Sequence, residues 1–521
     1  MMKLPLGSGL KHPHLPNAET RVAGHVFVVK GRLEAVASDV LIVPTSSNFV
    51  PRRTWWPALE LNEEPSAAIG TGRARQLPSR STAHRPAWIL NVAHDGRQSV
   101  PWLMAGLDEA LEEIKANAPR LGDGRVRPLI AMPTLGVGLG GYDGVRGDVI
   151  KSLLDHTTRF VEDSEFDIVI VVENAADYAA LQSIRRERHQ PTARSAAAEK
   201  LATRIRGGDV ALLLGAGVSV SAGLPNWDQL LKLIKLDTLP MLDDDAFAAM
   251  NVLDRAQLLS RSSGRSLGAR AAEATGSGAS HMPTLAHCLL ASLGVDKAVT
   301  TNYDTLYEDA CKSANGPKSI SVLPREEVTN KQSWLLKMHG DVADPDSIIL
   351  SRSDFVQYDS ERRPLASIVQ SLMATSHLIV IGASMTDDNV LRLAHEVLAM
   401  NASNNQRRLL GTVVTLQPDS LRAALWDGDF EYVAASQSSS MKVAARDLEI
   451  LLDGVAMHAS DRLPYLLDAR YGELLDEEEY EVAEYLRRVA KRIRRFGSAD
   501  RRHRWLPLLE TLEAMGERVN P

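Results

Sequence analysis

The sequence contains only two cysteines, Cys288 and Cys311, among its 521 residues. Two thiols exclude a disulfide framework and any zinc site built from four cysteines. The chain also lacks an uncharged run of the roughly 20 apolar residues that a membrane-spanning helix needs. Its first residues include a lysine but no apolar stretch typical of a signal peptide. We therefore expect a cytoplasmic protein with no membrane partner.

An excess of basic charge is absent as well. The chain has 59 basic and 66 acidic residues, a net charge of −7. Proteins that bind nucleic acid or anionic membranes usually carry a basic footprint, so the overall charge does not favour either partner. The apolar content of 44% and the charged content of 24% are those of a globular protein. The length exceeds what one ordinary core holds and predicts two to four domains.

The most informative stretch runs from Val210 to Trp227 and reads VALLLGAGVSVSAGLPNW. Its first five residues predict a buried parallel strand, the glycines a tight turn, and the apolar pattern after Pro225 a helix. Such a turn directs free backbone N–H groups and a helix dipole at one place, where a pyrophosphate can bind without obstruction by side chains. The third glycine comes late, at Gly223, so a plain strand-to-helix turn is the alternative.

Three further motifs follow, each at the end of an apolar run: TTNYD at 300–304, KMHG at 337–340 and GAS at 382–384. With GAGVSVSAGLPNW before them, they resemble in order the signatures of the sirtuins and their bacterial relatives. The resemblance implies that residues 200–420 form a doubly wound, Rossmann-like parallel sheet that binds NAD+. The implied NAD-binding residues are Gly215, Ala216, Gly217, Ser219, Gly223, Pro225, Asn226, Trp227, Thr301, Asp304, Gly382 and Ser384.

Asn302 and His339 are the catalytic candidates. Cleavage of the N-glycosidic bond of NAD+ passes through an oxocarbenium-like sugar, so a nucleophile must be positioned and positive charge stabilised. The resemblance places Asn302 where an amide can hold a water and bond a hydroxyl, and His339 can accept a proton. The alternatives are a turn-forming asparagine and a structural histidine. Asp304, Ser219 and Ser384 could bind the nucleotide or cap helices.

Two departures separate this chain from the sirtuin deacylases. The deacylases often carry a zinc ribbon over the nucleotide site, and two cysteines cannot build one, so we expect a helical cover. Residues Pro225–Asp228 read PNWD, where the deacylases usually have PDFR. Both departures favour the sirtuin-like bacterial effectors, which consume NAD+ during phage infection. The resemblance therefore implies a metal-free NAD+ glycohydrolase (NADase) that releases nicotinamide and ADP-ribose in antiviral defence.

Other classes of protein stay open. A non-catalytic sensor of NAD+ or ADP-ribose would use the same glycine-rich turn, and so would a deacylase or an ADP-ribosyltransferase. The presence of both Asn302 and His339 favours chemistry over binding alone, because a sensor needs neither side chain.

Residues 21–184 alternate short apolar runs with helical patterns, which predicts a mixed α/β module. The stretch SDVLIVPTSSN, which ends at Asn48, and the glycine-rich PTLGVGLGGYDG at 133–144 resemble the macrodomain, whose glycine loop wraps the diphosphate of ADP-ribose. The resemblance implies a regulatory nucleotide site formed by Asn48, Gly136, Val137, Gly138, Leu139, Gly140, Gly141 and Tyr142. Many macrodomains hold adenine with a Gly-Asp pair, but this chain has Gly31-Arg32. A loop that merely turns the chain is the alternative.

The remaining segments complete the predicted organisation. Residues 1–20 are expected to form a flexible leader, and residues 185–199 a linker or a solvated helix. Thr412–Leu416 is predicted to be the last strand of the sheet, and residues 421–521 a helical C-terminal region. There the basic run RRVAKRIRRF predicts a solvated face, while the acidic run Asp476–Glu479 could pair with it across helices or subunits. We therefore expect a homo-oligomer.

Overall fold

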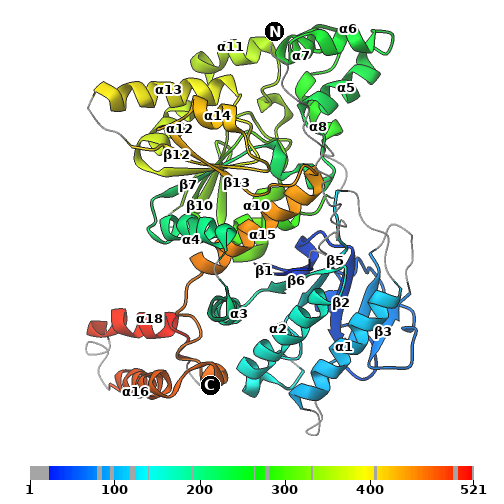
Figure 1. Ribbon diagram of the computed structural model, residues 1–521, viewed down its shortest axis with the longest axis vertical. Helices are drawn as coiled ribbons and strands as arrows, with labels where there is room; N and C mark the ends of the chain where they lie inside the picture. The colour runs from blue at the N-terminus through cyan, green and yellow to red at the C-terminus, as the bar shows by residue number, and fades with distance from the viewer. Residues whose placement is uncertain are drawn as a thin grey trace, which may run out of the picture.

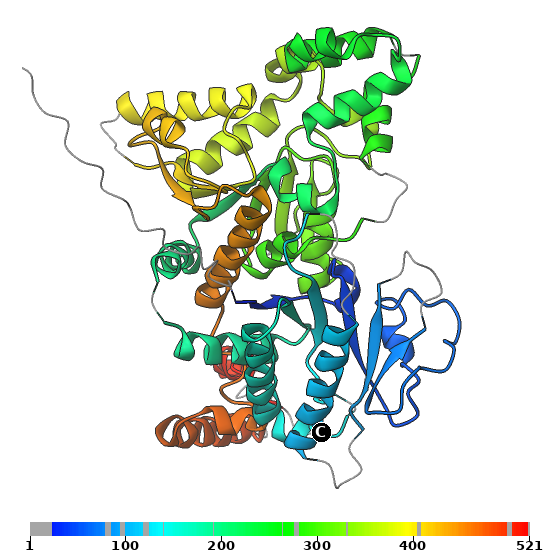
Figure 2. The ribbon, with the colours of Figure 1, turned by 45° about the vertical axis from the view of Figure 1, so that its right-hand side comes forward.

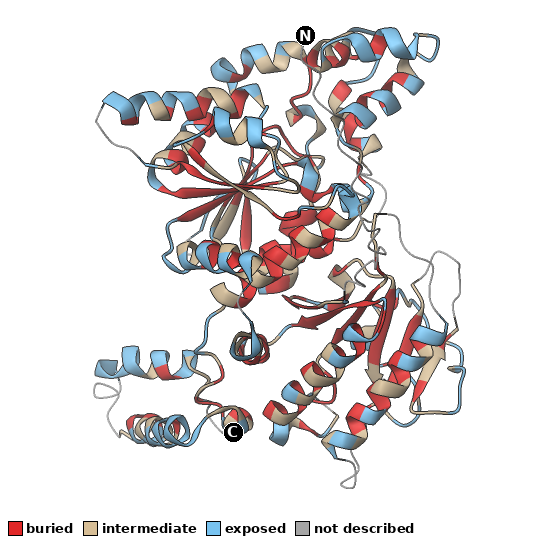
Figure 3. Ribbon diagram, in the orientation of Figure 1, coloured by how far each residue is buried: buried red, intermediate tan, exposed pale blue. Residues whose placement is uncertain are grey.

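The computed structural model describes residues 23–78, 85–93, 99–117, 124–138, 140–190, 192–262, 264–275, 281–329, 332–403, 408–496 and 503–518. The predicted leader, residues 1–20, lies outside these ranges. The described chain contains two β-sheets, each covered by helices (Figure 1). The strands of both sheets are largely buried (Figure 3). None of the helices in the described part is long and apolar enough to span a membrane.

The N-terminal sheet has six strands in the order β1-β6-β5-β2-β4-β3. Its neighbouring strands are parallel, except that β3 runs antiparallel to β4. The edge strand β3 was not predicted, because its sequence ARQL has no apolar alternation. The strands and the helices that flank them are β1 (Val26–Lys30), β2 (Val40–Thr45), β3 (Ala74–Leu77), β4 (Ala87–Asn91), α1 (Val100–Ala116), β5 (Leu129–Pro133), α2 (Arg146–Glu162), β6 (Asp167–Val172) and α3 (Ala175–Arg188).

The second sheet has seven strands in the order β13-β12-β11-β7-β8-β10-β9, and every pairing is parallel. The predicted doubly wound sheet is therefore observed, with β7 between β8 and β11. One prediction was wrong: β12 is not the last strand, because β13 pairs with it inside the region expected to be helical. The strands are β7 (Val210–Leu214), β8 (Lys297–Thr300), β9 (Ile320–Leu323), β10 (Ser333–Lys337), β11 (His377–Ile381), β12 (Gly411–Thr415) and β13 (Phe430–Ala434).

Helices cover both faces of this sheet, as alternation along β7 requires. Leu212 and Leu214 face a cluster with α4, α9, α10 and α15, whereas Ala211 and Leu213 face a cluster with α12 and α13. These helices are α4 (Ala193–Arg206), α9 (Leu285–Ser292), α10 (Leu306–Asn315), α11 (Arg352–Glu361), α12 (Arg363–Thr375), α13 (Asp388–Ser403), α14 (Ser420–Leu425) and α15 (Met441–Ala459).

A layer of four helices with its own apolar cluster stands over one edge of the sheet (Figure 1). They are α5 (Trp227–Thr238), α6 (Asp244–Ala249), α7 (Val252–Ser262) and α8 (Leu267–Ala274). This arrangement agrees with the expected helical cover. A separate C-terminal pair, α16 (Glu477–Arg494) and α18 (Leu506–Ala514), packs around Leu467, Ala483, Ala490 and Leu512.

Residues 185–199 do not form an extended linker. Helix α3 continues to Arg188, and α4 begins at Ala193 with a capping box between Thr192 and Ser195. The alanine-rich run has a high helix propensity and packs on α15. Ala198 is buried there, and a Cβ atom on Gly454 would lie 3.2 Å from its Cβ atom. Glycine at position 454 thus permits the close approach of the two helices.

Helix α15 lies between the two sheets (Figure 2). Its apolar residues pack with the helices of the second sheet, and its buried charged residues pair with the N-terminal module. Asp453 on α15 is fully buried and accepts hydrogen bonds from Arg185 of α3 (3.0 Å) and the Val28 N–H (3.2 Å), and its Oδ2 lies 2.7 Å from His25 Nε2. Burial alone would raise the pKa of Asp453, but Arg185 and His25 hold it at about 2. About two turns earlier in the same helix, Arg446 pairs with Asp167 of β6 through two bonds of 2.7 Å.

We predict that Asp453→Ala lowers the free energy of unfolding by about 3–5 kcal/mol, because it leaves a buried guanidinium without its carboxylate. The matched control is Lys200→Ala, which removes the half-exposed pair between Lys200 and Glu431 and should cost about 1 kcal/mol or less. Urea unfolding followed by circular dichroism measures both. Equal midpoints for the two variants would contradict a joining role for Asp453.

Candidate functional site

A cavity of about 710 Å³ opens at the carboxyl edge of the seven-stranded sheet. Because β7 lies between β8 and β11, the loops that follow these three strands meet there. The sheet contributes residues after β7, β8, β10 and β11, and the cover contributes Asn251, Val252, Leu253 and Thr275. A crevice at the point where strand order reverses is the usual ligand site of doubly wound sheets.

Every candidate residue of this sheet except Gly223 lines the cavity. Gly223 follows the second of two short 3-10 turns and has a φ of +79°, a left-handed conformation that favours glycine. Its role is therefore to turn the chain toward α5. The residues that the structure brings together are Gly215, Ala216, Gly217, Ser219, Pro225, Asn226, Trp227, Thr301, Asn302, Asp304, His339, Gly382 and Ser384.

The glycines after β7 allow two loops to touch. A Cβ atom on Gly215 would lie 2.6 Å from Ala383 Cα, and one on Gly217 would lie 2.8 Å from Gly382 Cα. The Gly217 N–H donates to the Gly382 carbonyl at 2.9 Å. The sequence analysis explained these glycines by the space that a bound phosphate needs. The structure shows a further reason, because the loops after β7 and β11 pack too closely for a side chain at either position.

Asn302 is held by its amide nitrogen. Nδ2 donates to the Gly215 carbonyl (3.1 Å) and to Ser219 Oγ (3.2 Å), whereas the buried Oδ1 has no hydrogen-bond partner. Asp304 has two contacts. Its Oδ2 accepts from Ser219 Oγ at 2.9 Å, and its Oδ1 accepts from the Leu306 N–H at the start of α10 at 3.1 Å. Asp304 therefore lines the cavity and also accepts from the first backbone N–H of α10.

His339 follows β10 and is 2% exposed. Its ring lies 5.2 Å from that of Phe355 between centroids, and its Nε2, which has no hydrogen-bond partner, is 3.5 Å from Asp387 Oδ2. Burial lowers the pKa of His339, and the Asp387 carboxylate opposes this shift. His339 is therefore neutral at pH 7. The sequence analysis missed Asp387, although the polar TDD run one residue after the GAS motif was a usable signal.

Lys337, at the end of β10, is a second residue that the sequence analysis missed. It is 1% exposed, and its Nζ lies 2.7 Å from Glu308 Oε1 and 3.3 Å from Asp341 Oδ1. Nζ also donates to the carbonyls of Tyr303 (3.2 Å) and Asp304 (2.6 Å). Burial raises the pKa of Glu308 to about 6 against the opposing effect of Lys337. The ammonium thus fixes the loop that carries Asn302.

Across the described ranges, no group of three or more His, Cys, Asp or Glu side chains is placed to bind a metal ion. Cys288 and Cys311 are both buried and free.

A second cavity, of about 330 Å³, lies at the carboxyl edge of the N-terminal sheet. The predicted residues Gly136, Val137, Gly138 and Gly140 line it, together with the end of β2, Arg52, Trp55 and Asn174. Asn48, Gly141 and Tyr142 do not line it, and Leu139 lies outside the described residues. Asn48 Oδ1 accepts from Ser46 Oγ and the Val50 N–H within its own turn. Tyr142 is a core residue under Gly136.

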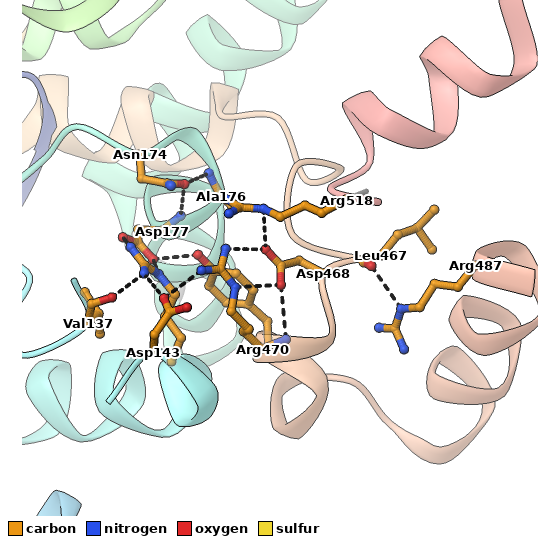
Figure 4. A network of polar contacts seen from close by, with 12 residues as sticks. Val137, Asp143, Asn174, Ala176, Asp177, Leu467, Asp468, Arg470, Arg487 and Arg518 are labelled. Atoms are coloured by element: carbon orange, nitrogen blue, oxygen red, sulfur yellow. Dashed lines mark hydrogen bonds and ion pairs between the residues drawn. The ribbon is translucent and has the colours of Figure 1, made fainter. Parts of the chain in front are cut away.

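The C-terminal region braces the loop of this second cavity (Figure 4). Arg146 is buried and donates to the Val137 carbonyl and to both carboxylate oxygens of Asp177, each at 2.6 Å. From the 3-10 segment Ala469–Leu474, Tyr471 OH donates to Asp177 Oδ1 and Arg470 to Asp143 Oδ1, again at 2.6 Å. The glycine loop is therefore tied to residues more than 300 positions away in sequence.

Gly31-Arg32, the position that departs from the macrodomain pattern, lies against α10. The Arg32 N–H donates to Ser313 Oγ at 2.8 Å, and the Arg32 side chain pairs with Glu34. This position thus contributes to the contact between the N-terminal module and helix α10 of the second sheet.

The seven-stranded sheet and its switch-point cavity define a Rossmann-type architecture, a class in which this crevice is the usual ligand site. Comparison with known proteins narrows this class. Residues 296–431 match the family described as "SIR2-like domain". The match includes the Asn302, His339 and Gly382 motifs, whereas the β7 turn precedes it.

Several curated relatives are similar to part of the chain. "NAD(+) hydrolase ThsA" of Enterococcus faecium is 26% identical over 204 residues, which are 38% of this chain and 42% of that protein. The protein of the same name from Bacillus cereus (strain MSX-D12) is 28% identical over 155 residues, 29% of this chain and 32% of the relative. "Defense-associated sirtuin 2" of Bacillus subtilis is 30% identical over 117 residues, 21% of this chain and 11% of the relative. The chain thus spans less than half the length of these relatives.

We predict that Lys337→Met lowers the free energy of unfolding by about 3–5 kcal/mol, because Glu308 is left buried without its ammonium. The double variant Lys337→Met/Glu308→Leu should recover most of this loss, since Asp341 keeps its contact with Arg325 at 2.8 Å. Lys297→Met, at the opposite end of the neighbouring strand β8, is the matched control. Chemical unfolding measures all three. A double variant no more stable than the single one would show that the Lys337–Glu308 pair is not the cause.

Proposed function

We propose that this chain is an NAD+ hydrolase that cleaves the nicotinamide N-glycosidic bond to give ADP-ribose and nicotinamide. One observation carries the proposal. Among the buried side-chain nitrogen and oxygen atoms without hydrogen-bond partners in the described structure, two belong to residues that line the 710 Å³ cavity: Asn302 Oδ1 and His339 Nε2. Leaving a buried polar group unpaired costs about 1–3 kcal/mol, so both atoms are candidates for contacts with a substrate.

In this mechanism, Asn302 Oδ1 accepts a hydrogen bond from the attacking water. The C–N glycosidic bond breaks and its electron pair leaves with nicotinamide, while the water oxygen bonds to the ribose carbon. Neutral His339 takes the proton that the water loses. Asp304 and Asp387 place negative charge beside the cavity, where it stabilises the oxocarbenium-like sugar. The backbone of Gly215–Gly217 is suited to the diphosphate.

The cover helices favour hydrolysis over deacylation. Two residues of the PNWD segment contribute to the cover: Asn226 caps α5 in a capping box with Gln229, and Asp228 accepts from Arg255 of α7 at 2.6 Å. The relatives, which include NAD(+) hydrolases and a defense-associated sirtuin, support NAD+ hydrolysis and a role in defence. We propose that this defence acts against phage and that the protein works in the cytoplasm as an oligomer. A non-catalytic NAD+ sensor, a deacylase or an ADP-ribosyltransferase is the outcome if the following test fails.

We predict that Asn302→Ala and His339→Ala each reduce NAD+ hydrolysis by about 100- to 10,000-fold, the range for a positioned catalytic group. The rate is measured as the release of nicotinamide and ADP-ribose, which chromatography separates and quantifies. Circular dichroism verifies that each variant is folded. Asn117→Ala and His156→Ala, whose side chains lie outside the cavity, serve as matched controls and should keep the wild-type rate. Wild-type hydrolysis by both cavity variants would overturn the assignment. Faster deacylation of acetylated peptides than hydrolysis would favour the deacylase.

We further propose that the N-terminal module is a macrodomain-like, regulatory nucleotide-binding module rather than a second active site. Its cavity offers the backbone of a glycine loop and Arg52, which suit a phosphate. An NAD+ hydrolase without control would drain the cell of NAD+. A ligand can provide control only by its difference in affinity for two states of the protein.

Gly138 offers a sharp test, because it lines the cavity and an added Cβ would meet no atom within 4 Å. We predict that ADP-ribose or a related nucleotide alters the NAD+ hydrolysis rate of the wild type. Gly138→Glu should abolish this response because its carboxylate repels phosphate, and Gly138→Gln, of equal size, should keep most of it. Titration of the hydrolysis rate with each nucleotide measures the effect. If neither ligand nor Gly138→Glu changes the rate, the module is not a nucleotide sensor.

A further inference from the structure

We propose that His287 is a positioning residue that keeps the Asn302 amide in its reactive orientation, acting through Ser219. This inference rests on the proposed hydrolase function. His287 lies in the first turn of α9 and is 1% exposed. It does not line the 710 Å³ cavity but lies behind it, with Nε2 3.2 Å from Ser219 Oγ. Because it is separated from the substrate cavity, it can influence the reaction only through its neighbours.

The hydrogen bonds of His287 determine which ring nitrogen carries the proton. Nδ1 lies 3.3 Å from the Thr284 backbone nitrogen and 2.8 Å from Thr284 Oγ1. A backbone N–H can only donate, so Nδ1 must accept. Burial lowers the pKa of His287 to about 4 despite the opposing Asp304 carboxylate, so the ring is neutral at pH 7. The single proton is therefore on Nε2, which donates to Ser219 Oγ.

This donation completes the hydrogen bonds of Ser219. Its hydroxyl accepts from His287 Nε2 and from Asn302 Nδ2, and it donates to Asp304 Oδ2. A hydroxyl has one proton and two acceptor positions, so no capacity is left. Asn302 Nδ2 also uses its second proton, on the Gly215 carbonyl. If the Asn302 amide rotated by half a turn, Oδ1 would take the place of Nδ2. It would then face the Gly215 carbonyl, which cannot donate, and the Ser219 hydroxyl would have to turn its proton from Asp304 to Oδ1.

His287 opposes this rotation of the Asn302 amide. Its Nε2–H group occupies one lone pair of Ser219 Oγ, so the hydroxyl proton of Ser219 stays directed at Asp304 Oδ2. Without the Nε2–H donor, the hydroxyl is free to rotate and to donate to a flipped Oδ1. The cavity would then contain an amide NH2 group in place of the carbonyl oxygen that holds water. We therefore expect a loss in kcat of about 5- to 30-fold, the equivalent of one hydrogen bond of about 1–2 kcal/mol. KM for NAD+ should change by less than about 2-fold, because His287 lies outside the substrate cavity.

The experiment compares His287→Leu with His287→Gln in the full-length chain. Both side chains are close to histidine in size. Leucine can neither donate nor accept a hydrogen bond, whereas the glutamine amide can still donate to Ser219. Leucine should show the loss in kcat, and glutamine should recover most of it, with similar melting temperatures for the two variants. Equal kcat values for the two variants, or a change confined to KM, would overturn the positioning role.

A second measurement is independent of catalysis. Long-range ¹H–¹⁵N correlation spectra of histidine-labelled protein at pH 7, assigned by the signal that His287→Gln removes, report the tautomer. We expect a neutral ring protonated at Nε2, and a ring protonated at Nδ1 would overturn the proposal. If the wild type does not hydrolyse NAD+, the proposed function fails. The spectrum still decides whether His287 donates to Ser219.

Discussion

The structure depends on the parallel direction of all seven strands in the second sheet. Parallel strands bring their carboxyl ends to one edge, and the reversal of strand order at β7 separates the helices that would otherwise close that edge. Backbone bonds then connect the three loops: the Thr301 N–H donates to the Leu214 carbonyl at 3.2 Å, and the Gly217 N–H to the Gly382 carbonyl. Motifs that lie up to about 170 residues apart in sequence thereby share one cavity.

The same sheet is joined to the N-terminal module through α9 and α10, two helices that begin close to residues of the cavity lining. Helix α9 has His287 beside Ser219 in its first turn, and at its other end Ser292 Oγ accepts from the Lys30 N–H at 2.9 Å. Helix α10 follows Asp304 directly, and its Ser313 contacts Arg32. Both helices are packed in one continuous apolar cluster. These contacts connect the end of β1 with the surroundings of Asn302, and we propose that the regulation acts along them.

The sequence contained most of the fold and of the candidate site, but few of their contacts. Strands such as β7 have buried apolar runs and were predicted, whereas β3 and β13 are short edge strands without a clear pattern. The motif residues were found because each follows a strand. Lys337, Asp387 and His287 were not assigned roles, because their partners depend on which strands are neighbours. The order of the strands in a sheet is a tertiary property, and the spacing of apolar residues along the sequence does not reveal it. The packing role of Gly217 is hidden for the same reason.

The environment of His339 reflects a compromise between protonation state and base strength. Burial lowers its pKa and so keeps the ring neutral and able to accept a proton at pH 7, but a lower pKa also makes it a weaker base. Asp387 reduces this disadvantage, because its carboxylate 3.5 Å away stabilises the imidazolium that forms after proton transfer. Phe355 packs against the ring with its own ring centroid 5.2 Å away. Asn302, by contrast, needs a fixed orientation and no charge. The hydrogen bonds of its Nδ2 group and of Ser219 are all used, and only Oδ1 is left open toward the substrate. The two candidate catalytic groups thus receive the different kinds of support that their proposed tasks require.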